Sequence, residues 1–256
     1  MENKSRKKRR QWILKCGSIV LVLGVLGRFS SVAYATDMLR EVTADRRPVL
    51  TMFAQIGAAG ATGRFEKAEQ LFAQGKTTGL SELQMYEAVL NLLPYIGYPR
   101  TLSTMSRFQK VYPQYIRERD AGKDLQPTEP WEQYAVKVWG ERGAQIRGQL
   151  GLGGPGEADF VRQLTLLSPE LTEWVLYDDF GRIFGRAGLS LIERKAIVIG
   201  TLAAQAAPQI VAHRKAMLRV GGSDELIDSL LEAVSEIVDE KALAMARQHL
   251  VEARQQ

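Results

Sequence analysis

The chain has 256 residues, of which 45% are hydrophobic and 25% charged, a balance that is typical of a folded protein and excludes disorder of the chain as a whole. Residues 1–35 hold eight of the 34 Lys and Arg residues but only one of the 29 acidic residues, so the formal net charge of +5 belongs to the N-terminus. The other 26 basic and 28 acidic residues give no basic surplus, which argues against DNA or RNA as a partner.

Residues 1–35 have the three parts of a secretory signal peptide. A basic stretch at 4–10 precedes an apolar run at 19–26, and the Ala-Tyr-Ala sequence at 33–35 suits cleavage after its last residue. The apolar run is short against the roughly 20 residues that a membrane span needs, although an uncleaved anchor is the alternative. We therefore expect a periplasmic or secreted bacterial protein that meets the membrane only through this signal segment.

Two details of this segment bear on the export route and on the chemistry of the mature chain. Arg9 and Arg10, followed by apolar residues, are similar to a twin-arginine signal, which carries folded proteins across a membrane; a generic basic region is the alternative. The single cysteine, Cys16, lies inside the segment. Cleavage would leave no thiol, which excludes disulfides, cysteine–zinc sites and thiol catalysis.

Helical periodicity dominates the rest of the sequence, and no segment alternates as a strand would. This pattern predicts an all-α fold. Capping boxes that begin at Ser81 and Ser190 mark two of the helix starts. The helices are expected near residues 37–57, 63–75, 81–93, 98–117, 131–147, 168–184, 190–205, 208–220, 223–238 and 239–254.

Stretches rich in glycine and proline divide the helical part of the chain. The linker sequence Gln-Pro-Thr-Glu-Pro occupies 126–130, and five glycines and a proline fall within 148–156, where we expect a loop. We accordingly predict a first helical repeat at 36–117, a linker with a short helix at 118–158, and a second helical repeat at 159–256.

The two halves of the sequence resemble each other. Residues 79–90 and 221–232 both run from a glycine turn through a serine into a helix of the same apolar phase. The sequence Tyr-Ile-Gly-Tyr-Pro at 95–99, which predicts a break and restart between helices, follows in the first half only. Leu71 stands at the position equivalent to His213, so we expect a degenerate first copy and a second copy that carries the site, or one composite site between them.

Three segments together resemble the carboxymuconolactone decarboxylase family, of the alkylhydroperoxidase-D-like superfamily. Residues 79–99 are similar to its Gly-Leu-Ser turn, amphipathic helix and Tyr-x-Gly-Tyr-Pro junction. Residues 188–194 resemble its opening Gly-Leu-Ser-x-x-Glu-Arg, and residues 213–221 its His-x-x-Ala-Leu-x-x-x-Gly helix. The resemblance implies a helical bundle that assembles as a homo-oligomer of trimer or hexamer type. It also implies decarboxylation or proton transfer on a small anionic lactone or carboxylic acid, without a cofactor.

His213 is the leading catalytic candidate. Ile210, Met217 and Val220 share its helix face, so its side chain should point inward, and burial should keep the imidazole neutral. A neutral imidazole can move a proton near neutral pH, and Glu193 could orient it by accepting a hydrogen bond. The alternatives are a structural core histidine and a purely capping role for Glu193.

Further residues are candidates for binding the substrate. Arg194 and Arg214 could hold a carboxylate through paired hydrogen bonds, the alternative being solvated surface charges. Tyr95 and Glu87 are the other candidates. With two histidines in the whole chain, we expect no metal site. The superfamily's Cys-x-x-Cys peroxidase chemistry is excluded, and the alternative function is a non-catalytic exported helical binding or interaction module.

Overall fold

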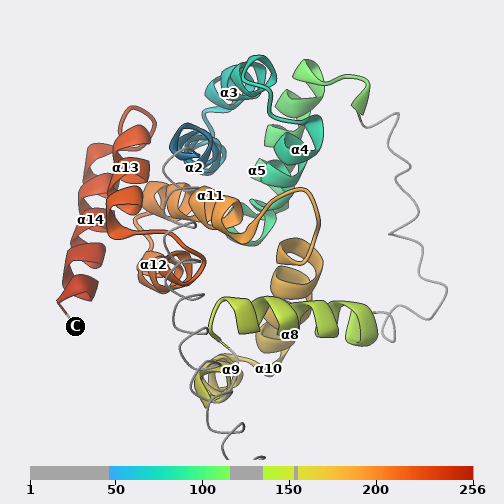
Figure 1. Cartoon of the computed structure of the whole chain (residues 1–256), viewed down its shortest axis with the longest axis vertical. Coiled ribbons are helices and arrows are strands. Elements are labelled where there is room, and N and C mark those ends of the chain that lie inside the picture. Colours follow the sequence, from blue (N-terminus) through green and yellow to red (C-terminus); the bar gives the residue numbers. More distant parts are fainter. Residues whose placement is uncertain (1–45, 116–134, 153–154, 256) are drawn as a thin grey trace, which may run out of the picture. The chain divides into compact units, whose positions relative to one another are not determined.

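Helices provide the regular structure of the computed structural model, which describes residues 46–115, 135–152 and 155–255 (Figure 1). No strand occurs in these three ranges, so the all-α prediction is confirmed. None of the helices in the described ranges is both long and apolar enough to span a membrane. The predicted signal peptide at 1–35 and the linker sequence at 126–130 lie outside the described residues.

The first half of the described chain is a run of α-helices, of which two lie within three residues of the predicted 63–75 and 81–93, whereas the other two differ from the predicted 37–57 and 98–117 by five residues or more. A capping box opens the third of them, because the Gln84 N–H donates to Ser81 Oγ at 3.2 Å and the Ser81 N–H donates to Gln84 Oε1 at 3.0 Å. Gly97 has a φ of 67° and interrupts the fourth, as expected of the break within 95–99. The helices are α2 (Arg47–Thr62), α3 (Phe65–Thr77), α4 (Glu82–Leu90) and α5 (Leu93–Val111).

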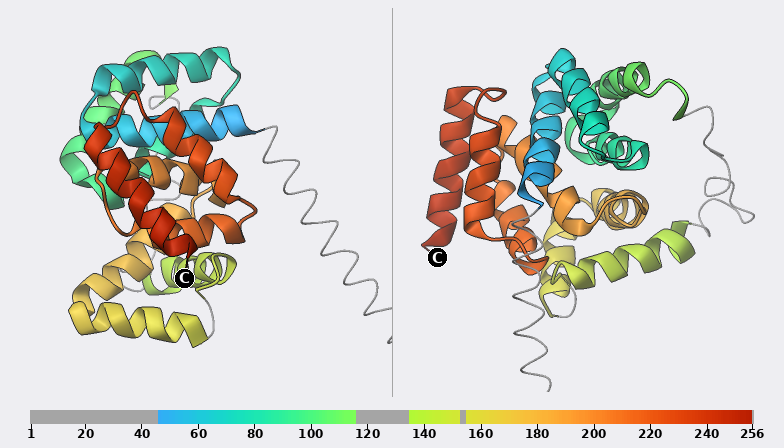
Figure 2. Two further views of the ribbon diagram at one scale, coloured as in Figure 1. Left: turned by 90° about the vertical axis from the view of Figure 1, so that its left-hand side faces the viewer. Right: turned by 45° about the horizontal axis from the view of Figure 1, so that its top comes forward.

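The middle of the chain is more helical than predicted. A glycine-rich loop was expected at 148–156, but Pro155 begins a helix, because a proline at the first helical position loses no hydrogen bond. The expected short linker helix is present and packs against a π-helix further along the chain (Figure 2). The elements are η1 (Ala135–Trp139, π), α8 (Gly140–Gln149), α9 (Pro155–Leu167), α10 (Pro169–Trp174) and η2 (Val175–Phe184, π).

The second half again follows its predicted helices within a few residues. Gly221 has a φ of 92° just beyond the second helix of this half, and Ser223 caps the third by accepting from the Leu226 N–H at 3.1 Å. The order of helices resembles that of the first half, and the internal repeat itself stays a prediction. The helices are α11 (Leu191–Ala204), α12 (Ile210–Arg219), α13 (Asp224–Ala233) and α14 (Glu240–Arg254).

Helices α2 and α11 lie directly against each other and join the two halves (Figure 1 and Figure 2). Each also contacts helices of both halves, so the pair forms the centre of the hydrophobic core. The two backbones approach closely because a glycine of each helix, Gly57 on α2 and Gly200 on α11, faces the backbone of the other helix. A Cβ atom at Gly57 would lie 2.2 Å from the Ile197 carbonyl oxygen, and one at Gly200 would lie 2.0 Å from that of Ala54.

Candidate functional site

His213 lies against a lysine and a tyrosine. On α12, its Nδ1 atom is 3.4 Å from Nζ of Lys195, which projects from α11. The Tyr95 ring, from α5, meets the imidazole edge-on, with 5.6 Å between ring centres. The pKa of His213 is held well below its usual value, first by burial and then by the positive charge of Lys195. The predicted neutral, inward-pointing histidine therefore agrees with the geometry.

Lys195 is buried, and its ammonium group pairs with no carboxylate of the described ranges. Lys195 as a whole is only 2% exposed, and its Nζ lies 4.1 Å from the centre of the Phe184 ring. Among the residues that the structure describes, no Asp or Glu oxygen lies within ion-pairing distance of Nζ. Burial lowers the pKa of Lys195 to about 8; the charge of Asp179 works in the opposite direction, and the charge of Arg194 adds a smaller lowering effect.

Asp179 completes the group from the π-helix η2. Burial raises the pKa of its carboxyl well above the usual value, although the charge of Lys195 partly offsets this effect. The charge of Asp179 in turn adds to burial in raising the pKa of Tyr95. Within the described part of the chain, Asp179 Oδ1 and the Tyr95 hydroxyl are buried and have no hydrogen-bond partner. We call Tyr95, Asp179, Lys195 and His213 the Lys195 cluster.

The Lys195 cluster has the features of a functional site rather than of a hydrophobic core whose polar atoms are all hydrogen-bonded. A buried polar atom without a partner costs about 1–3 kcal/mol, so an ordinary core satisfies such atoms. The pKa of Lys195 falls to about 8 and that of Asp179 rises to about 7, so both groups exchange protons near neutral pH beside a neutral imidazole. Groups that can take and give protons at one pH are what general acid–base catalysis requires. The π-helix that carries Asp179 is also a form that recurs at functional sites.

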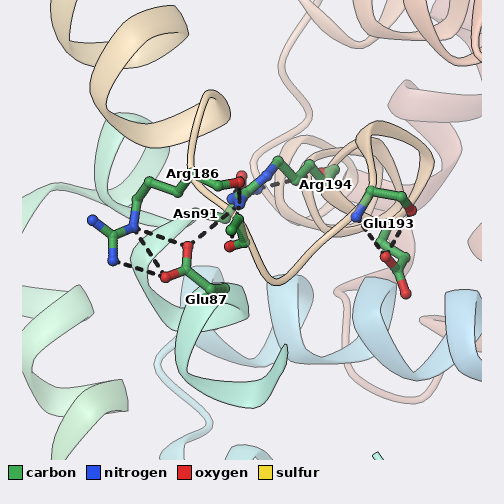
Figure 3. A network of polar contacts seen from close by, with 7 residues as sticks. Glu87, Asn91, Arg186, Glu193 and Arg194 are labelled. Atoms are coloured by element: carbon green, nitrogen blue, oxygen red, sulfur yellow. Dashed lines mark hydrogen bonds and ion pairs between the residues drawn. The ribbon is translucent and has the colours of Figure 1, made fainter. Parts of the chain in front are cut away.

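Glu87 and Arg194 meet each other in a separate buried network (Figure 3). Arg186 binds both carboxylate oxygens of Glu87 from Nε at 3.0 Å, and Arg194 Nη2 lies 3.3 Å from Glu87 Oε2. Arg194 also contacts Asn91 Oδ1 at 3.4 Å and donates to the Arg186 carbonyl at 2.7 Å. Arg194 is fully buried, so the alternative of a solvated surface charge does not describe it. Its two Nη atoms bind protein partners, whereas Nε has no hydrogen-bond partner among the described residues.

Glu193 faces away from His213. Its carboxylate accepts from the N–H and the hydroxyl of Ser190, both at 2.6 Å, and also binds Arg46. The capping role is thereby confirmed, whereas the expected hydrogen bond from His213 to Glu193 does not form. The reason is rotational: two residues along an α-helix turn the side chain by about 200°, so Lys195, and not Glu193, reaches the histidine.

Arg214 is also engaged elsewhere. Its Nε and Nη2 atoms each lie 2.7 Å from a carboxylate oxygen of Asp224, at the start of α13. This bidentate ion pair raises the pKa of Arg214 and lowers that of Asp224. The guanidinium thus ties α12 to α13, and the expected role in substrate binding is not supported. Of the six predicted site residues, the structure brings together His213 and Tyr95 in the Lys195 cluster.

Sequence reasoning missed Lys195 and Asp179. A usable signal existed for the lysine, which directly precedes the apolar run 196–199 and follows Leu191 by one helical turn. Asp179 stood beside Asp178 in a pair of acids, with nothing local to say which one would be buried. Among the described residues, no group of three or more His, Cys, Asp or Glu side chains could hold a metal ion. Comparison with known proteins finds no matching family model and no matching curated protein.

Asp179→Asn should change how stability depends on pH. A carboxyl whose folded pKa is raised contributes stability that is fully present below its unfolded pKa and is lost as pH rises through its folded pKa. The amide cannot ionise, so between pH 5 and 8 the variant should gain about 1–2 kcal/mol relative to the parent. Urea unfolding at both pH values measures the difference.

Asp178→Asn is the matched control for that measurement, because the Asp178 side chain is 44% exposed and pairs with Arg182. Its stability should follow the parent within about 0.5 kcal/mol at both pH values. An Asp179→Asn variant that tracks the parent equally closely would mean that the Asp179 carboxyl is not buried as described.

Proposed function

We propose that the chain is an acid–base enzyme that carries out decarboxylation or proton transfer on a small anionic lactone or carboxylic acid, with the Lys195 cluster as its site. The observation that carries the proposal is the convergence of four ionisable side chains from α5, η2, α11 and α12, two of them with buried polar atoms that find no partner among the described residues. A ligand with oxygen atoms would supply the missing hydrogen bonds.

Each member of the Lys195 cluster has a chemical role in this proposal. His213, kept neutral, accepts a proton from the substrate, and the protonated carboxyl of Asp179 is the complementary acid. The Tyr95 hydroxyl donates a hydrogen bond to a substrate oxygen. Lys195 is the basic group that meets the anionic substrate, in place of the two arginines expected from the sequence.

The resemblance to the carboxymuconolactone decarboxylase family supports the reaction class and stays part of the proposal. Export to the periplasm or beyond, and assembly into a homo-oligomer, likewise remain predictions. The competing proposal is a non-catalytic exported binding module. It places the same small acid in the Lys195 cluster but without turnover, so the two differ in one measurable outcome.

The test is turnover of a panel of small lactone acids and oxo acids, including 4-carboxymuconolactone, followed by carbon dioxide release and by NMR. His213→Gln should lower kcat/KM by about 100-fold or more, the usual scale for loss of a general acid–base group. His249→Gln on α14 is the matched control and should leave kcat/KM unchanged. Binding that depends on His213 but gives no turnover with any compound would replace the enzyme by the binding module.

A further inference from the structure

We infer that Lys195 is a nucleophile that forms an imine with the carbonyl carbon of a small 3-oxo acid. This inference rests on the proposed function and names the substrate class and the covalent step. It comes from one geometrical fact: Lys195 is buried on α11, and within the part of the chain that the structure describes its Nζ contacts an imidazole nitrogen and an aromatic ring instead of a carboxylate.

The surroundings of Nζ favour the neutral amine. Moving an ammonium ion out of water without a bonded counter-ion costs several kcal/mol, so buried lysines are nearly always paired. The Phe184 ring, whose centre is 4.1 Å from Nζ, stabilises the charged form by about 0.5–2 kcal/mol, which is less than the cost of desolvation. The lowered pKa of Lys195 is the consequence, and the neutral amine is the form that attacks a carbonyl carbon.

The neighbours of Lys195 can carry every proton of the step. Nζ attacks the carbonyl carbon, the carbonyl oxygen takes a proton from the Asp179 carboxyl, and Nζ passes a proton to His213 Nδ1, 3.4 Å away. The carbinolamine hydroxyl then takes the proton that His213 has just accepted and leaves as water, and the C=N bond forms as a protonated imine beside the Asp179 carboxylate. The balance is one amine and one carbonyl to one imine and one water, with no oxidant or reductant.

A carboxylate on the substrate would place negative charge next to the imine formed on Lys195. The protonated imine is a buried cation, and a substrate carboxylate would add a second negative charge beside it, next to the Asp179 carboxylate that the step leaves behind. In a 3-oxo acid, the bond to that carboxylate can break with its electron pair flowing to the imine nitrogen, which releases carbon dioxide and leaves an enamine. A proton on carbon and one water then return the ketone and free Lys195.

The charged and titratable groups around Nζ predict how the step depends on pH. Arg194 on α11 and burial lower the pKa of Lys195, Asp179 on η2 raises it, and neutral His213 on α12 and Tyr95 on α5 complete the surroundings. Imine formation should therefore begin at a pH below that of an ordinary lysine. Asp179→Asn removes the opposing charge and should move this onset to lower pH, a shift that a merely structural aspartate would not cause. The adduct should also form more slowly in this variant, because the carbonyl oxygen loses its proton donor.

The experiment is to incubate the full chain with acetoacetate, reduce with borohydride, and locate the covalent adduct by peptide mass spectrometry at several pH values. The adduct should map to Lys195 and be lost in Lys195→Met and in Lys195→Arg. Two variants guard against a folding defect, since Met keeps the volume and Arg the charge, and circular dichroism checks both. Lys215→Met, on the exposed side of α12, should leave the adduct unchanged.

The outcomes separate this inference from the proposed function. An adduct on Lys195 that forms at lower pH in Asp179→Asn supports the imine. His213-dependent turnover without an adduct, or with adducts spread over exposed lysines, overturns the imine and leaves the acid–base proposal intact. Absence of both turnover and adduct across the panel overturns both.

Discussion

Gly200→Ala is expected to destabilise the protein by about 3 kcal/mol or more, even though alanine is the better helix former by about 1 kcal/mol. The new methyl carbon would lie 2.0 Å from the Ala54 carbonyl oxygen and 2.7 Å from its carbonyl carbon. Both are backbone atoms of α2, so no side chain can rotate away. The helices α2 and α11 would have to separate, and the loss would spread through the core that they centre.

Urea unfolding, followed by circular dichroism, measures this effect. Gly148→Ala is the matched control, because Gly148 lies in α8 and a methyl group there would meet no other atom within 4 Å. That control should be as stable as the parent or gain up to about 1 kcal/mol. Gly57→Ala, on the opposite side of the same contact, should resemble Gly200→Ala. A Gly200→Ala variant with the parent's midpoint would show that α2 and α11 do not approach closely.

The fold followed from the sequence wherever the signal was local. Ser81 and Ser223 begin helices because their hydroxyls accept backbone N–H groups three residues on, and Gly221 follows the end of one because it tolerates a positive φ. The sequence does not predict α9, because the glycines before it favour a loop that extends through Pro155, although proline is favoured at a first helical position.

The candidate site followed only in part, because it depends on which faces of different helices meet. The inward orientation of His213 could be predicted from the apolar residues on its own helix. Its neighbour could not, since Glu193 and Lys195 are two residues apart on α11 and no local pattern says which side α12 will contact. The burial of Arg194 depends likewise on Glu87, 107 residues earlier in the chain.

The second large effect is expected from Glu87→Ala, which should cost about 3–5 kcal/mol of stability. Glu87 is 1% exposed and Arg194 is not exposed at all, so removing the carboxylate leaves a buried guanidinium that keeps its charge. The control is Glu232→Ala, which breaks a pair with Arg247 at the surface and should cost at most about 1 kcal/mol. Equal effects of the two variants in urea unfolding would contradict the buried network.

A double variant separates the value of the ion pair from the penalty of breaking it. In Glu87→Leu with Arg194→Met, both buried charges are gone, and Arg186, which is partly exposed, can turn to solvent. The double variant should regain most of the stability that Glu87→Ala loses, because apolar groups of similar size replace a buried ion pair at little cost.

The double variant also links the network to the Lys195 cluster. Loss of the Arg194 charge should raise the pKa of Lys195, so imine trapping should begin at higher pH than in the parent.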